Sequence, residues 1–239
     1  MIETAKNPHL IQIAVFIQHD EKEDAESYHE LEKVIAYITE EYKAPEPKLH
    51  IVDYHDAKNA YYARFMVQKM YNNEQYQLSV DSHMRFVSEW DSKLIAHLSD
   101  CSHSKPILTV YPRPYKLAKD GSTVLNEGAP VSMCFKLFAP NDGLPRWKAR
   151  NLNASKAALQ LQRPFSCLFL AAGFNFSRGE LLKECGYTNE IDDVFFGEEL
   201  FQMHKYYQQG WALFSPPDTL VYHLWERQYR TTYNKDRVG

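Results

Sequence analysis

The sequence predicts a single α/β domain with a mostly parallel mixed sheet flanked by helices. The chain has 239 residues, of which 44% are hydrophobic and 14% aromatic, and this length suits one sizeable core but not a second full domain. Short apolar runs alternate with segments of helical periodicity in its first half. Strands that alternate with helices usually pair through crossover connections, so the sheet is expected to be mostly parallel.

Each predicted strand in the first half is followed by a segment with helical spacing of its apolar residues. Residues 10–17 form an apolar run typical of a buried strand, and 25–42 form an amphipathic, glutamate-rich helical pattern. Further strands are expected at 49–54, 76–80 and 107–111, and further helices at 57–71 and 90–98. Ligands of such sheets gather beyond the carboxyl ends of strands, so the residues just after each strand are the first candidates for function.

The second half of the chain has weaker periodicity. Residues 112–130 are rich in Pro, Gly, Asn and charged side chains, which predicts a long irregular excursion before the apolar segment 131–138. A buried strand, a glycine turn and a returning strand are expected within 166–177. The remaining elements are expected to be a helix at 197–209, closed by Gly210, and two strands at 211–214 and 220–224.

Charge and composition argue against two classes of partner. The formal net charge is −4 and no long basic run occurs, so the electrostatic pattern of a nucleic-acid-binding protein is missing. The longest apolar stretches fall far short of the roughly 20 residues that span a bilayer, and the start, MIETAKNPHL, does not resemble a secretory signal. The four cysteines form no CxxC pair, which favours reduced thiols. We therefore expect a cytoplasmic protein without a transmembrane segment.

The candidate metal ligands are Asp81 and His83, directly after the predicted strand at 76–80. In an extended chain residues i and i+2 point to the same side, so both side chains can face one ion while Ser82 points away. A carboxylate with an imidazole suits Mn²⁺ or a related divalent cation, which can neutralise a diphosphate leaving group. The alternative is that Asp81 caps a turn and that His83 is an ordinary surface or core histidine.

The segment Asp81-Ser82-His83-Met84-Arg85-Phe86, followed by Trp90-Asp91, resembles the metal-binding signature of a known enzyme family. That family is the polypeptide N-acetylglucosaminyltransferases, which includes the cytoplasmic hydroxyproline-linked enzymes and their mucin-type relatives. Further blocks are similar in order and approximate spacing: Ala63-Arg64, Lys105-Pro106-Ile107-Leu108, Tyr111-Pro112, Ala171-Ala172-Gly173-Phe174, Phe196-Gly197-Glu198-Glu199, Gly210-Trp211 and Val221-Tyr222-His223. The resemblance covers nearly the whole chain.

The resemblance implies a GT-A-like fold, the nucleotide-diphospho-sugar transferase fold. It also implies transfer of N-acetylglucosamine from UDP-GlcNAc to a hydroxyl of a protein (hydroxyproline, Thr or Ser) or of a glycan, with retention of anomeric configuration. Mn²⁺ or another divalent metal would be held by Asp81, His83 and His223. Without the resemblance, His223 reads as a hydrogen-bonded histidine near the C-terminus.

Roles for other residues follow from the same resemblance. Arg64, with Asp81 and Ser82, would contact the donor, because a guanidinium fork matches phosphate oxygens; a solvated helix arginine is the alternative. A catalytic role would belong to Glu198 or Glu199, which the sequence does not separate. Carboxylates in the first turn of a helix are also explained by the helix dipole alone.

The single domain, 1–239, would then divide into two halves. Residues 1–111 would form the donor- and metal-binding half, and residues 112–239 the acceptor half with the Gly197-Glu198-Glu199 helix and His223. Family members usually start with a strand and a helix that have no counterpart before residue 10, so we expect an N-terminally truncated version. Residues 1–6 resemble the end of a helix stopped by Asn7-Pro8.

Two other functions stay open, and this departure motivates the first of them. The chain is alternatively a catalytically silent or truncated homologue that acts as a binding protein for protein or glycan. A metal-dependent hydrolase that uses Asp81, His83 and His223 is a third possibility. We rank it last, because no HxH or HExxH pattern occurs.

Overall fold

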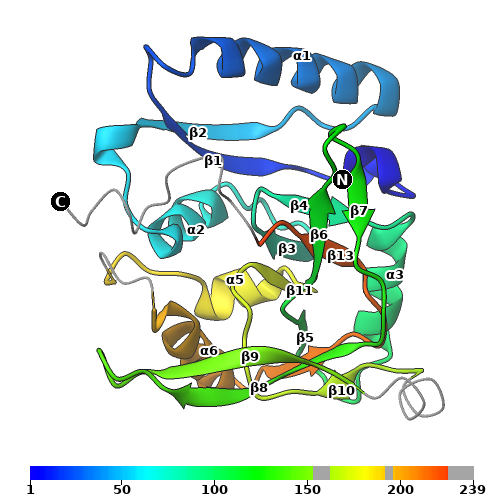
Figure 1. Ribbon diagram of the computed structural model, residues 1–239, viewed down its shortest axis with the longest axis vertical. Helices are drawn as coiled ribbons and strands as arrows, with labels where there is room; N and C mark the ends of the chain where they lie inside the picture. Colours follow the sequence, from blue (N-terminus) through cyan, green and yellow to red (C-terminus); the bar gives the residue numbers. More distant parts are fainter. Residues whose placement is uncertain (153–161, 192–195, 226–239) are drawn as a thin grey trace.

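The computed structural model describes residues 1–152, 162–191 and 196–225 (Figure 1). Its centre is a five-stranded sheet with the order β10-β12-β5-β11-β3. The bounds of these strands are Phe165–Ser166 for β10, Ala212–Ser215 for β12, Pro106–Thr109 for β5, Phe174–Arg178 for β11 and Tyr76–Val80 for β3. Strand β3 occupies the residues that the sequence predicted for it.

The α/β class holds, but the expected predominance of parallel pairs does not. In the central sheet only β12 and β5 pair in parallel, and β11 is antiparallel to both β5 and β3. Outside it, β1 (Ala14–His19) and β2 (Lys48–Asp53) form a parallel pair. The strand that precedes β11 in the chain is β10, which pairs with β12 and not with β11, so no βαβ crossover joins β11 to a parallel neighbour.

Two apolar clusters lie on the two faces of the central sheet. Successive strand residues point to opposite faces, and accordingly Leu108 belongs to the cluster under helix α3 (Trp90–Ser99), whereas Ile107 belongs to the cluster under α5 and α6. Helix α5 spans Glu180–Cys185 and α6 spans Glu198–Gln208. The sequence predicted α3 and α6 to within a few residues, but it did not predict α5, which has only six residues.

Helix α1 (Ala25–Tyr42) lies with β1 and β2 at one end of the molecule, at the top of Figure 1. Its bounds are those predicted, but Ile38 is its only buried residue. Strand β1 begins four residues later than predicted, because Pro8–Leu10 form a 3-10 turn. Residues Ile2–Thr4 form another such turn where the end of a helix was expected. No helix among the described residues is long and apolar enough to cross a membrane.

A second sheet has the order β4-β13-β6-β7 and lies beside the central one (Figure 1). Its strands are β4 (Met84–Phe86), β13 (Val221–His223), β6 (Arg113–Leu117) and β7 (Thr123–Leu125). The prediction of an irregular excursion over 112–130 was therefore wrong, because β6 and β7 pair antiparallel there.

The buried side chain of Arg113 organises the end of this segment. It donates five hydrogen bonds, to the backbone oxygens of Asn126, Glu127 and Ala129 and to the side-chain oxygens of Asn126 and Asn151. The composition of the segment hid its strands, because Pro, Gly, Asn and charged residues are typical of turns and loops.

The last hairpin pairs β8 (Val131–Phe138) with β9 (Pro145–Asn151). The sequence predicted β8, but β9 falls in a polar stretch where no strand was expected. Helix α2 (Ala60–Gln68) is shorter than predicted at both ends. It starts at Asn59, whose side chain accepts a hydrogen bond from the backbone N–H of Tyr62, as an N-cap does.

Candidate metal and donor site

Asp81 follows the last residue of β3, as the sequence indicated. Its backbone N–H donates to the carbonyl oxygen of Gly173 over 3.2 Å, which fixes the end of β3 against the turn that precedes β11. A methyl group on Gly173 would lie 2.6 Å from Oδ2 of Asp81. Glycine at this position therefore leaves the space that the carboxylate occupies.

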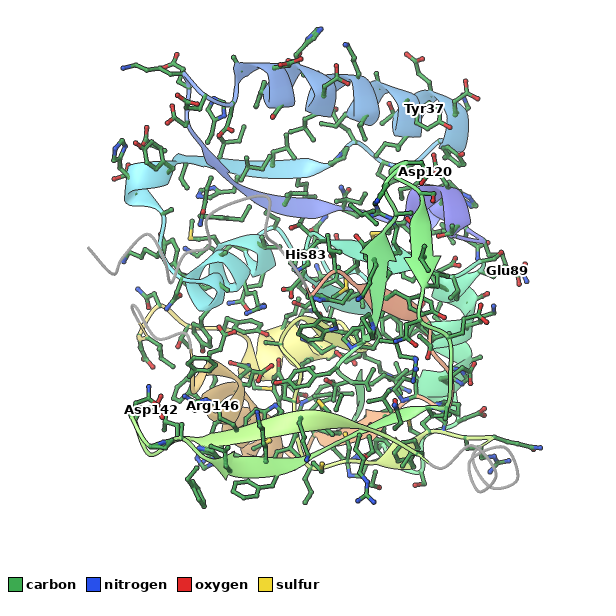
Figure 2. The ribbon with its side chains drawn as sticks, in the orientation of Figure 1. Tyr37, His83, Glu89, Asp120, Asp142 and Arg146 are labelled. Atoms are coloured by element: carbon green, nitrogen blue, oxygen red, sulfur yellow. The ribbon has the colours of Figure 1, made fainter. Side chains whose placement is uncertain are left out.

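His83 and His223 are brought together by the pairing of β4 and β13. His223 lies opposite Met84 in this antiparallel ladder, and the N–H of Leu224 donates to the carbonyl oxygen of His83 over 3.1 Å. The two imidazole rings have centroids 4.3 Å apart. Figure 2 shows His83 near the centre of the molecule.

Asp81, His83 and His223 offer three ligand atoms that all lie within 4.8 Å of one another. Oδ2 of Asp81 lies 3.2 Å from Nε2 of His223, whose side chain is 3% exposed. The other nitrogen of His223, Nδ1, is buried without a hydrogen-bond partner in the described part of the chain. One carboxylate and two imidazoles are a donor set that suits a divalent transition metal, so the residues present fit such an ion.

Arg64 and Glu198 form a buried ion pair next to this cluster. Nη1 of Arg64 donates to Oε1 of Glu198 over 2.9 Å, and Nη2 lies 3.4 Å from Oδ1 of Asp81. Their side chains are only 15% and 10% exposed. The second carboxyl oxygen of Glu198, Oε2, is buried and has no hydrogen-bond partner within the described ranges. The structure thus places Arg64, Asp81 and Glu198 in one connected group, together with His83 and His223.

Burial and charge act in opposite directions on these groups. Burial alone would raise the pKa of Asp81, but the hydrogen bond from His223 and the charge of Arg64 outweigh it and lower the pKa to about 2. Burial raises the pKa of Glu198, and the neighbouring Arg64 reduces that rise. For Arg64, burial disfavours the charged form, yet Glu198 and Asp81 together raise its pKa.

The side chain of Glu199 has different hydrogen-bond partners from that of Glu198. Its Oε1 accepts a hydrogen bond from the backbone N–H of Ala172 over 2.8 Å, and its Oε2 accepts one from the hydroxyl of Tyr111 over 2.9 Å. Burial raises the pKa of Glu199 to about 7, although these two donors lower it. Ser82 is exposed, and its Oγ lies 3.4 Å from Nδ1 of His83.

Two residues of this region were not among the predicted site residues. Trp225 has its ring centroid 4.1 Å from that of His223, and its Nε1 donates to the carbonyl oxygen of Pro112. Its position two residues after His223 was the available signal, because such residues share a side of an extended chain. Tyr111 was noted only as part of a sequence block, and its hydrogen bond to Glu199 joins segments 88 residues apart.

Comparison with known proteins identifies the family and the fold of the chain. The family model described as "Glycosyltransferase (GlcNAc)" matches residues 38–237. Among solved structures, GalNAc-T7 in complex with UDP, GalNAc and Mn²⁺ is similar, with a TM-score of 0.61 and 17% sequence identity. The match covers 92% of this chain and 38% of that chain. No curated protein sequence matches significantly. The fold is thus that of the GT-A glycosyltransferases, and the chain belongs to the GlcNAc glycosyltransferase family.

Proposed function

We propose that this protein is a metal-dependent transferase that moves N-acetylglucosamine from UDP-GlcNAc to a hydroxyl group, with retention of anomeric configuration. The acceptor would be a hydroxyproline, Thr or Ser of a protein, or a glycan. One observation carries the proposal. The metal-ligating candidates Asp81, His83 and His223 lie directly beside the Arg64–Glu198 ion pair. Membership of the family and the Mn²⁺ and UDP bound to GalNAc-T7 support it.

In this proposal Asp81, His83 and His223 hold a divalent cation, with Mn²⁺ as the first candidate. Such an ion supplies Lewis-acid stabilisation of the negative charge on a departing diphosphate. The chain brings the three ligands together from both proposed halves, because Asp81 and His83 precede residue 111 and His223 follows it. We also propose that residues 1–111 form the donor- and metal-binding half and residues 112–239 the acceptor half.

Arg64 would bind the anionic part of the donor. Its guanidinium is largely buried and is oriented by Glu198 and Asp81, so little side-chain entropy is lost when a phosphate oxygen binds. Ser82 is exposed beside His83 and would contribute a hydroxyl donor. Glu198 keeps one buried oxygen, Oε2, for a sugar hydroxyl of the donor or for positive charge at the anomeric carbon.

The proposed location is the cytoplasm. Support comes from Cys101, Cys134, Cys167 and Cys185, all of which are free thiols.

The test is calorimetric titration with UDP in the presence and absence of Mn²⁺, followed by an assay of UDP release from UDP-GlcNAc with hydroxyproline, Thr and Ser peptides. Wild type should bind UDP only with Mn²⁺. Asp81→Ala should weaken this binding by more than the roughly 10–100-fold that outer-shell substitutions cause, whereas Asp100→Ala, a change of an exposed aspartate at the end of α3, should leave it intact.

Each outcome separates the alternatives. Mn²⁺-dependent UDP binding with sugar transfer would support the proposed activity. Binding without turnover on any acceptor would favour a catalytically silent binding protein. UDP-GlcNAc cleavage at a rate independent of acceptor would favour a hydrolase. Binding that is the same in Asp81→Ala as in wild type would refute the metal site.

A further inference from the structure

Glu199 makes two hydrogen bonds that tie helix α6 to the central sheet. It lies in the first turn of α6, one residue after Glu198. Its Oε1 accepts from the N–H of Ala172 in the turn before β11, and its Oε2 accepts from the hydroxyl of Tyr111, two residues after β5. Both carboxyl oxygens are therefore occupied by donors from the protein itself.

The turn that Glu199 contacts is the one against which Asp81 packs. The carbonyl oxygen of Gly173 accepts the hydrogen bond from the N–H of Asp81. The absence of a side chain on Gly173 leaves the space for the Asp81 carboxylate, since a methyl group there would approach Oδ2 to 2.6 Å. A displacement of Ala172 would thus move the backbone and the side chain of Asp81 together.

Thr109 holds the same turn from the other side. Its hydroxyl accepts from the N–H of Ala171 and donates to the carbonyl oxygen of Phe174, both over 2.9 Å. The N–H of Ala172 lies between these two anchored positions and donates to Glu199. Without Glu199 this buried N–H would lose its acceptor, which is costly in the interior. The turn would then be distorted at Ala172 but still held at its ends.

We propose that Glu199 is a positioning residue for the metal site, acting through the turn at residues 171–173 on the carboxylate of Asp81. This inference rests on the proposed function, because it takes Asp81 as a ligand of the cation. It removes Glu199 from the candidate catalytic groups and leaves Glu198 as the glutamate that faces Arg64. Tyr111 has the same positioning role, because its hydroxyl donates a hydrogen bond to the other carboxyl oxygen of Glu199.

A positioning role and a catalytic role of Glu199 predict different behaviour of the Glu199→Gln variant. The side chain of glutamine offers a carbonyl oxygen to the N–H of Ala172 and an amide donor to the hydroxyl of Tyr111, which can accept a hydrogen bond. A proton acceptor in the reaction, in contrast, cannot be replaced by an amide.

The experiment is a calorimetric titration of Mn²⁺ in the presence of saturating UDP, with Glu199→Gln, Glu199→Ala and Tyr111→Phe. The matched control is Glu180→Ala, which changes an exposed glutamate in the first turn of α5. Glu199→Ala should weaken Mn²⁺ binding by about 10–100-fold, the range for groups that orient a ligand. Glu199→Gln should stay within about threefold of wild type, Tyr111→Phe should fall between the two, and the control should not change. Thermal melts identify any variant that does not fold.

Three results would overturn the inference. Glu199→Ala could bind Mn²⁺ as wild type does, although Asp81→Ala does not. Glu199→Gln could lose as much affinity as Glu199→Ala while both variants remain folded. Glu199→Gln could keep Mn²⁺ affinity but lose all turnover, which would make the carboxylate catalytic. Failure of the proposed function is distinct from these, because it appears as wild-type binding that does not depend on Asp81.

Discussion

Replacing Glu199 with glutamine should change how the stability of the domain depends on pH. Burial raises the pKa of Glu199 to about 7 in the folded chain, whereas an unfolded glutamate titrates near about 4.3. Between these two values the folded state binds more protons than the unfolded state, so the free energy of unfolding falls as the pH rises. The contribution of the protonated carboxyl is fully present below about pH 4.3 and is lost above about pH 7.

The size of the effect follows from the two pKa values. At about 1.4 kcal/mol per pH unit, the wild-type chain should lose about 2 to 3 kcal/mol between about pH 5 and about pH 8 through this group alone. Glutamine does not titrate, so the glutamine variant should lack this loss. The groups that face Glu199 are Tyr111 from the end of β5, Glu198 from α6 and Arg64 from α2. They remain in both proteins, so only the part of their titration that depends on the charge of Glu199 enters the comparison.

Urea denaturation followed by tryptophan fluorescence at about pH 5 and about pH 8 measures the difference. Both pH values lie well above the pKa of Asp81, which is about 2, so the titration of that carboxyl does not contribute to the difference in stability. Glu180→Gln is the matched control, because this glutamate also lies in a first helical turn but is exposed. The reasoning would be refuted if wild type and Glu199→Gln lost stability equally between the two pH values.

Three further substitutions test other parts of the structure. Gly173→Ala places a methyl group 2.6 Å from Oδ2 of Asp81, so Mn²⁺ affinity measured by calorimetry should fall about tenfold or more; unchanged affinity would show that the carboxylate need not occupy this position. Arg113→Lys cannot keep all five hydrogen bonds and should lower the free energy of unfolding by about 1–3 kcal/mol. The exposed Arg150→Lys should have almost no effect in the same urea titration. Leu94→Ala removes a fully buried side chain from α3 and should cost about 2–5 kcal/mol; a smaller loss would contradict the core packing of this helix.

The elements that the sequence predicted best have a regular apolar pattern over their full length. Helix α1 and strand β3 lie where their periodicity placed them. Strands β6 and β7 were missed because their surroundings are rich in turn-forming residues, and the segment after β7 is held by hydrogen bonds from the side chain of Arg113. Local composition contains no information about such a partner.

In the candidate site, too, the sequence predicted a relation between residues close in the chain but not the long-range pairings. The spacing of Asp81 and His83 after a strand indicated that they face one ion, because that relation is local. The pairing of Arg64 with Glu198 joins residues 134 positions apart, and nothing in either segment specifies it. Consecutive helix residues are rotated by about 100°, so Glu198 and Glu199 had to point in different directions, but only the packing of α6 decides which of them faces Arg64.

Charge balance explains why the cation and the anionic donor should depend on each other. Asp81 and Glu198 are two carboxylates that share one guanidinium, Arg64, so with neutral histidines the site carries a net charge of about −1. A diphosphate that enters this site alone meets a repulsive potential at low solvent exposure, where charges are poorly screened. A divalent cation held by Asp81, His83 and His223 would change this net charge to about +1, and Arg64 would then bind an oxygen of the diphosphate. From these charges we expect UDP to bind tightly only when the divalent cation is present.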